Sequence, residues 1–157
     1  MSKKFLSLAL MFAVCSCVHL DDAKTVKKEP VMPAEDQEAL LQGAPQDLAR
    51  VASLNGFPSP DQVLARSTQV SLSARQLADI SSLRDKLRRK AARLGEQIVK
   101  TEKKLEQDFK RQPVPTREVS RRVVAIAKLR GQIRLLHLRG HLAVAKMLTS
   151  EQLNHFR

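Results

Sequence analysis

Two histidines stand four residues apart near the C-terminal end of the chain. On a helix, residues at this spacing project from the same side, so the imidazoles of His137 and His141 could supply two ligands to one metal ion. The residues between them, Leu138, Arg139 and Gly140, add no acidic ligand. The pair is therefore a candidate site for Zn²⁺, Ni²⁺ or Cu²⁺. The alternative is that His137 is a histidine packed in a helical core.

The rest of the composition argues against an enzyme. The chain has five Phe but neither Trp nor Tyr, so it lacks the large rings that commonly line a deep substrate pocket. No paired carboxylates and no nucleophile with a neighbouring base can be assigned to one pocket. We therefore expect no catalytic residues and no required cofactor, with a Zn, Ni or Cu ion as the one alternative.

Both cysteines lie at the end of an apolar N-terminal segment. Two lysines precede the apolar run 5–14, which is shorter than the ~20 residues of a membrane span but typical of a secretory signal. The string VCSC at 14–17 resembles the lipobox of bacterial lipoproteins, which implies lipidation of Cys17. Ordinary signal-peptidase cleavage is the alternative. We expect 1–17 to be the signal peptide of a protein exported to the periplasm. If Cys17 carries lipid, we expect the protein to be anchored to the outer membrane.

The remaining chain divides at about residue 70. Residues 18–69 contain five of the seven prolines and are mildly acidic, which predicts a flexible tether with short helices. Residues 70–157 carry 21 basic and eight acidic residues, so the basic character of the protein belongs to them. Helices are predicted over 74–111 and 117–147, followed by a short closing helix. The expected fold class is all-α: a long antiparallel helical hairpin with short flanking helices.

Each long helix has an apolar seam that advances by alternating three- and four-residue steps, the pattern of helices that pack side by side. A lone hairpin covers only one side of each helix, and a small single core is marginally stable. Pairing two hairpins would cover the remaining sides. We therefore expect a homodimer.

Two similar strings, LSARQ at 72–76 and LTSEQ at 148–152, mark the starts of two helices. In each, a hydroxyl caps the helix and a glutamine three residues later reaches back to the backbone N–H of the cap, which is a capping box. The leucine before the cap is expected to pack on the first turn. The motif positions are Leu72, Ser73 and Gln76 in the first string, and Leu148, Thr149 and Gln152 in the second.

The chain is thus expected to be an exported, basic helical hairpin, with LSARQ at the start of its first long helix and LTSEQ after the end of its second. This arrangement resembles the Spy/CpxP family, which is known for its LTxxQ motif. The resemblance covers about 68–157, with Ser73 where Thr is usual and Ser150 where Pro is frequent. It implies a cradle-shaped all-α dimer in the bacterial envelope. Such proteins act as ATP-independent chaperones, as heavy-metal sensors or resistance proteins, or as partners of an envelope sensor kinase. No catalytic residues come with the resemblance.

Basic residues on the two long helices are the candidate client-binding surface. Cations mixed with apolar side chains attract acidic segments of unfolded proteins and then hold them by apolar contact. Export and the lack of base-stacking rings argue against nucleic acid. The alternative is that these residues are only the solvated face of a coiled coil. The candidates are Arg88, Arg89, Lys90, Arg93, Lys103, Lys104, Arg121, Arg122, Arg130 and Arg134.

Overall fold

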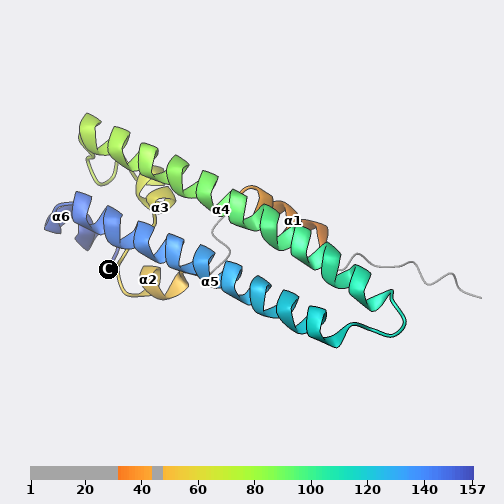
Figure 1. Ribbon diagram of the computed structural model, residues 1–157. Coiled ribbons are helices and arrows are strands. Elements are labelled where there is room, and N and C mark those ends of the chain that lie inside the picture. Colours follow the sequence, from red (N-terminus) through yellow and green to blue (C-terminus); the bar gives the residue numbers. More distant parts are fainter. Residues whose placement is uncertain (1–31, 44–47) are drawn as a thin grey trace, which may run out of the picture.

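The computed structural model describes residues 32–43 and 48–157, and a pair of long antiparallel helices dominates it (Figure 1). Helix α4 spans Ala74–Phe109 and α5 spans Thr116–Met147, within two residues of the predicted bounds. The described residues contain no strand, so the all-α class and the helical hairpin are confirmed. None of the helices in these ranges is long and apolar enough to cross a bilayer.

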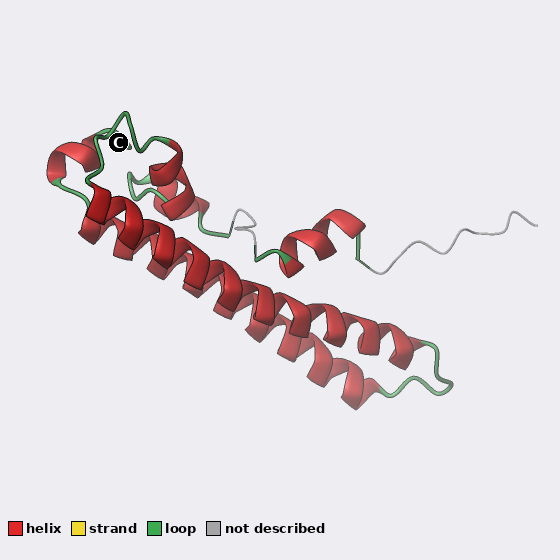
Figure 2. Ribbon diagram, turned by 90° about the horizontal axis from the view of Figure 1, so that it is seen from above, coloured by secondary structure: helices red, strands yellow, loops and turns green. Residues whose placement is uncertain are grey.

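Within the described residues, four short helices accompany the hairpin. They are α1 (Ala34–Leu41), α2 (Arg50–Leu54), α3 (Pro60–Ala65) and α6 (Ser150–Asn154). Helices α1 and α3 pack on α4, and α2 and α3 contact α5. Figure 2 shows α1, α2 and α3 on the same side of the hairpin. Helix α6 turns back at the end of the hairpin where α4 begins (Figure 1).

The predicted tether over 18–69 contains these first three helices. Its described part folds back along the hairpin, and Val63 of α3 is fully buried against Ile80 of α4 and Val144 of α5. The prolines limit the length of each helix without preventing packing, because Pro60 is buried at the first position of α3, where it lacks only an N–H that the helix would not use. Residues 1–31, with the expected signal peptide and Cys17, lie outside the described residues.

Two apolar clusters form the core of the part of the chain that the structure describes, and each takes residues from a short helix as well as from the hairpin. The first joins α1 to both long helices, and its buried members are Leu40, Ala91, Ile98, Val99, Ile126 and Ile133. The second lies under α3, where Leu72 and Leu148 of the two motif strings pack beside Val63, Ile80 and Val144. Burial of this kind drives folding, and here part of the hairpin face is covered by the same chain rather than by a second copy.

Both predicted capping boxes are present. The Ser73 hydroxyl accepts the Gln76 N–H and the Thr149 hydroxyl accepts the Gln152 N–H, each at 3.2 Å. The two glutamine side chains also meet: Gln76 Nε2 donates to Gln152 Oε1 at 2.8 Å and to the Met147 carbonyl at 2.9 Å. The two strings, 76 residues apart, are thereby held together at one end of the hairpin.

Two glycines allow α1 to lie close to α4. A Cβ added at Gly95 would be 2.1 Å from the Leu40 carbonyl oxygen, so no other residue fits there without moving α1. Gly43 ends the α1 segment with φ +62°, and a Cβ there would be 2.3 Å from the Arg88 carbonyl oxygen. The positive φ and the close backbone contact both require glycine.

Candidate functional site

The candidate client-binding residues are exposed, apart from the partly buried Arg122. The structure distributes them along the hairpin. Arg88 turns toward α3 and pairs with Asp61 at 2.8 Å, and Arg130 pairs with Glu102 at 3.6 Å. Arg89, Lys103 and Arg134 are exposed side chains of the two long helices.

Lys90 and Arg93 come together in a groove between α4 and α5, which we call the basic groove. Its volume is about 500 Å³, within the range of small-molecule and peptide sites. Leu94, Leu135 and Leu136 supply its apolar lining, and Leu135 is 47% exposed. The full lining is Lys90, Arg93, Leu94, Gln132, Leu135, Leu136 and Arg139.

The three cations of the basic groove have no acidic partner within the described part of the chain. Lys90, Arg93 and Arg139 are absent from its ion pairs, whereas Arg88, Arg122 and Arg130 each face a carboxylate. The groove therefore presents uncompensated positive charge beside apolar surface. Sequence reasoning did not place Arg139 in this surface. The sequence does contain a pattern that predicts this position. Arg139 lies four residues after Leu135 on α5, and residues at that spacing share a helix face.

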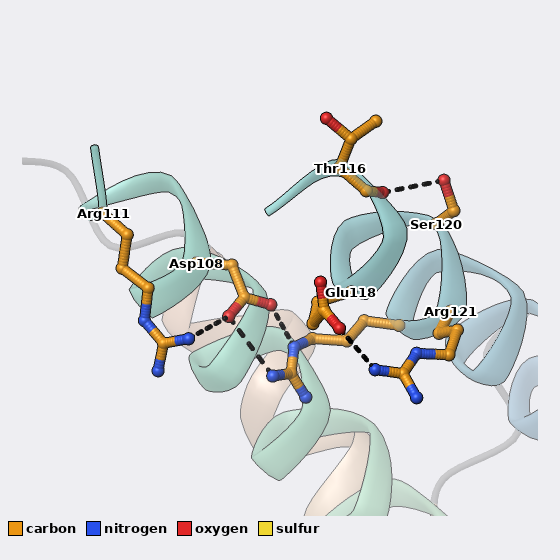
Figure 3. Close-up of polar contacts among 7 residues, drawn as sticks. Asp108, Arg111, Thr116, Glu118, Ser120 and Arg121 are labelled. Atoms are coloured by element: carbon orange, nitrogen blue, oxygen red, sulfur yellow. Dashed lines mark hydrogen bonds and ion pairs between the residues drawn. The ribbon is translucent and has the colours of Figure 1, made fainter. Parts of the chain in front are cut away.

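The far end of the hairpin carries a charged network centred on Asp108 (Figure 3). The Asp108 carboxylate is fully buried and accepts hydrogen bonds from Arg122 Nε and from Arg122 Nη2, the latter at 3.2 Å. Arg111 lies 3.8 Å away. The hydrogen bonds from Arg122 hold the pKa of Asp108 below its ordinary value of 3.8. Arg122, predicted to bind clients, is therefore engaged in holding α5 to α4.

Asp108 was not singled out from the sequence, although a signal was present. It lies three residues after Leu105, so it continues the three- and four-residue steps of the α4 seam. An acid at a seam position predicts a partner across the hairpin. Beside this network, a cavity of about 390 Å³ is lined in part by Lys104, Arg121 and Arg122, and Arg121 pairs with Glu118 at 2.6 Å.

The two histidines proposed as metal ligands are buried, with 7% of His137 and 3% of His141 exposed. His141 Nδ1–H donates to the Phe57 carbonyl oxygen at 2.7 Å, because a carbonyl can only accept. His137 Nε2 is buried and has no hydrogen-bond partner among the described residues. Burial holds the pKa of His137 below its ordinary 6.5, and the nearby His141 acts in the same direction.

The surroundings of His137 and His141 do not favour a bound metal ion. The histidines share a cavity of about 20 Å³ with Asp61, Arg84 and Arg88. The two guanidinium groups oppose a bound cation. In the described ranges, no three His, Cys, Asp or Glu side chains are grouped in a way that could hold a metal ion.

No family model, curated protein or solved structure matches this chain. The resemblance to the Spy/CpxP family therefore rests on the two LTxxQ-like strings and on the basic helical hairpin between them.

Proposed function

We propose that this protein is an ATP-independent chaperone of the Spy/CpxP type, which acts in the periplasm and binds unfolded or stress-damaged envelope proteins. The observation that supports this most is the basic groove. It offers three leucines and three cations that have no acidic partner among the described residues. In this proposal the exported chain is a homodimer, and Cys17 is the point of lipid attachment.

The chemistry of the groove matches that of an unfolded client. Unfolded segments expose apolar side chains interspersed with carboxylates, and such a segment satisfies both the leucines and the cations of the groove. Each charge contact at an exposed site is worth at most ~1 kcal/mol, so a bound segment can also leave again. A chaperone that works without ATP needs this weak, reversible binding.

Two alternatives use other parts of the same structure. A heavy-metal sensor or resistance protein would depend on His137 and His141, which no third His, Cys, Asp or Glu of the described residues joins in a metal-binding group. An accessory regulator would present the basic groove to an acidic loop of an envelope sensor kinase. We favour the chaperone because the groove combines apolar surface with charge, whereas recognition of an acidic loop needs charge alone.

The test is suppression of client aggregation, followed by light scattering in a chelator and without ATP. We expect the purified protein to suppress aggregation of an acidic unfolding client. The variant Lys90→Gln/Arg93→Gln/Arg139→Gln should bind about tenfold more weakly, because three contacts of some tenths of a kcal/mol each are lost. Added salt should weaken wild-type binding.

A matched control removes the same charge elsewhere. Lys86, Lys100 and Lys128 are exposed and lie outside the groove, so Lys86→Gln/Lys100→Gln/Lys128→Gln should retain most of the suppression. Equal losses in both triple variants would show that net charge, and not the groove, binds the client. Suppression that occurs only with added Zn²⁺ would favour the metal-sensor alternative.

A further inference from the structure

Helix α2 and the turn after it carry exposed apolar side chains. Val51 and Leu54 lie three residues apart, on one face of this helix, and are 52% and 72% exposed. Phe57, in the connection to α3, is 38% exposed. Leu54 is the most exposed large apolar side chain among the described residues. We call Val51, Leu54 and Phe57 the apolar tip.

The turn after α2 brings Phe57 back to the helix. The Gly56 N–H donates to the Ser53 carbonyl at 3.2 Å. The Phe57 N–H donates to the Ala52 carbonyl at 3.0 Å. With φ +76° at Gly56, these two bonds form a Schellman motif, in which the residue after the glycine commonly packs on the helix residue five or six positions earlier. Those positions are Ala52 and Val51, so the motif joins Phe57 to the exposed surface of α2.

Three exposed arginines lie near the apolar tip. Arg50 is the first residue of α2. The Arg157 side chain packs on Gly56, since a Cβ built there would lie 2.8 Å from Arg157 Cγ, and Figure 1 shows the C-terminal end beside α2. The Arg66 guanidinium lies 5.4 Å from the centroid of the Phe156 ring, the neighbour of Arg157 in the chain. None of the three arginines has an acidic partner within the described part of the chain.

Few acids accompany these cations. The segment 48–73 contains a single acidic residue, Asp61, and its carboxylate pairs with Arg88 of α4 at 2.8 Å. The C-terminal segment 150–157 adds one acid, Glu151, in the first turn of α6. The chain as a whole carries a net charge of +12, which attracts an anionic surface from a distance. The tip therefore combines protruding apolar side chains with cations.

We infer that the apolar tip is a membrane-contact site, which inserts into the surface of a bilayer that contains anionic phospholipids. The acyl region of such a surface accepts the apolar side chains, and its phosphates attract the guanidinium groups beside them. A bilayer is flat on the scale of a small protein, so side chains that protrude can enter it, as Leu54 does. The leucines of the basic groove line a hollow, which suits an extended segment instead.

The apolar tip and the basic groove lie on different faces of α5. The tip approaches α5 where His141 donates to the Phe57 carbonyl at 2.7 Å. Leu135 of the groove is six residues earlier on α5, which places it about 120° around the helix axis from His141. A bilayer contact at the tip thus leaves the groove open to a client.

Lipid attachment at Cys17 would keep the tip close to a bilayer. Met32, the first described residue, lies 15 residues after Cys17, so the chain between them spans at most ~50 Å. A tether of this length raises the effective concentration of a second contact, and weak binding at the tip then suffices. This step rests on the proposed function, which includes the lipid. The affinity of the tip for anionic phospholipid does not.

The experiment uses single tryptophans as reporters, since the chain contains no Trp. Leu54→Trp and Val51→Trp each place one in the tip, at positions so exposed that the larger ring needs no repacking. On vesicles of phosphatidylglycerol and phosphatidylethanolamine, the emission of both full-length variants should shift to the blue, and doxyl-labelled phospholipid should quench it. Unchanged emission of both reporters on these vesicles would overturn the membrane contact.

Two further reporters make the result specific to the tip. The apolar run 5–14 can itself enter a vesicle, so the full chain is compared position by position. Phe109→Trp at the far end of the hairpin and Leu135→Trp in the basic groove are exposed, and vesicles should leave their emission unchanged. An equal shift at Leu135→Trp would assign the contact to the groove. A shift of Leu54→Trp that grows with protein concentration without vesicles would assign the tip to a second copy, and either result would refute the site.

Charge variants test the arginines beside the tip. In the Leu54→Trp protein, Arg50→Gln/Arg157→Gln should require at least tenfold more anionic lipid for the same shift, and so should the use of phosphatidylcholine vesicles. Lys86→Gln/Lys100→Gln removes the same charge from exposed lysines of α4 and should have a much smaller effect. Equal losses in both variants would show that net charge alone draws the chain to lipid, and the site would be wrong.

The outcome is separable from that of the chaperone test. Suppression of client aggregation is measured without lipid, and the tryptophan reporters are read without a client. Loss of the lipid-induced shift would therefore refute the membrane contact and leave the proposed chaperone function standing.

Discussion

A buried carboxylate at the end of α4 gives the hairpin its main fixed charge contact. Asp108 is fully buried, and Arg122 of α5 bonds to both of its oxygens. A partner lost from a buried pair leaves the other charge uncompensated, which destabilises a protein far more than loss of an exposed pair. Among the ion pairs of the described residues, those of Asp108 alone have a fully buried carboxylate.

We predict that Asp108→Asn lowers the Tm by roughly 5 °C or more, since it leaves the Arg122 charge without a partner. Because the pKa of Asp108 is held below 3.8, its contribution is fully present above pH 3.8 and is lost as the pH falls below that value. The Tm difference between wild type and variant should therefore shrink toward pH 2, as measured by circular dichroism. The exposed Asp79, which pairs with Arg75 at 3.8 Å, gives the control Asp79→Asn, for which we expect almost no change. A similar loss in both variants would contradict the prediction.

At the scale of elements, the close contact between α1 and α4 depends on the missing side chain of Gly95. Alanine favours a helix by ~1 kcal/mol over glycine, so an unobstructed Gly→Ala change would stabilise α4. At Gly95 the added Cβ meets the Leu40 carbonyl at 2.1 Å, which is backbone and cannot rotate away. Steric conflict therefore outweighs helix propensity at this position.

We predict that Gly95→Ala displaces α1 and lowers the free energy of unfolding by about 1–3 kcal/mol. Hydrogen exchange within Ala34–Leu41 should rise sharply while the centre of α5 stays protected. Gly131 offers the matched control, because a Cβ there meets nothing within 4 Å. Gly131→Ala should leave exchange in α1 unchanged. Unchanged α1 exchange in Gly95→Ala would mean that α1 does not depend on this contact.

At the scale of the whole molecule, the short helices cover one part of the hairpin and leave another free. Val124 and Leu142 of α5 are 67% and 52% exposed. They are 18 residues apart, five full helical turns, so they lie on the same stripe of α5. Ile133 of the buried seam lies on the opposite side of this helix. Leu135, which is 47% exposed and also lines the basic groove, lies on the same face between them, so this face presents apolar side chains to a second copy of the chain.

We predict a homodimer that uses this stripe. Sedimentation equilibrium should give twice the chain mass at micromolar concentration, and the Tm should rise with protein concentration because association stabilises the folded state. Val124→Lys/Leu142→Lys should weaken association at least tenfold. Leu54→Lys changes a leucine of α2 that is 72% exposed, more than either residue of the stripe, and should leave association unaltered. A monomer mass at 100 µM would rule out the dimer, and equal weakening by Leu54→Lys would rule out the stripe.

The sequence alone determined the elements that depend on local interactions. Hydrophobic periodicity located α4 and α5, and the spacing of Ser73 to Gln76 and of Thr149 to Gln152 located two helix starts. Each of these signals acts within four residues, so it is readable without knowing the rest of the fold. The sequence also showed that the basic character belongs to the hairpin.

Only the tertiary structure decided what each face meets. Periodicity marks a face as apolar but does not say which segment covers it, so the packing of α1 and α3 on the hairpin was not predicted. The same limit explains the contacts of Gln76 with Gln152 and of Asp108 with Arg122, which join residues far apart in the chain. It also explains the histidines: spacing placed His137 and His141 on one side of a helix, and the fold brought His141 to the Phe57 carbonyl and both rings to a cavity that Arg84 and Arg88 also line. Long-range contacts depend on how the chain closes its loops, which local patterns do not encode.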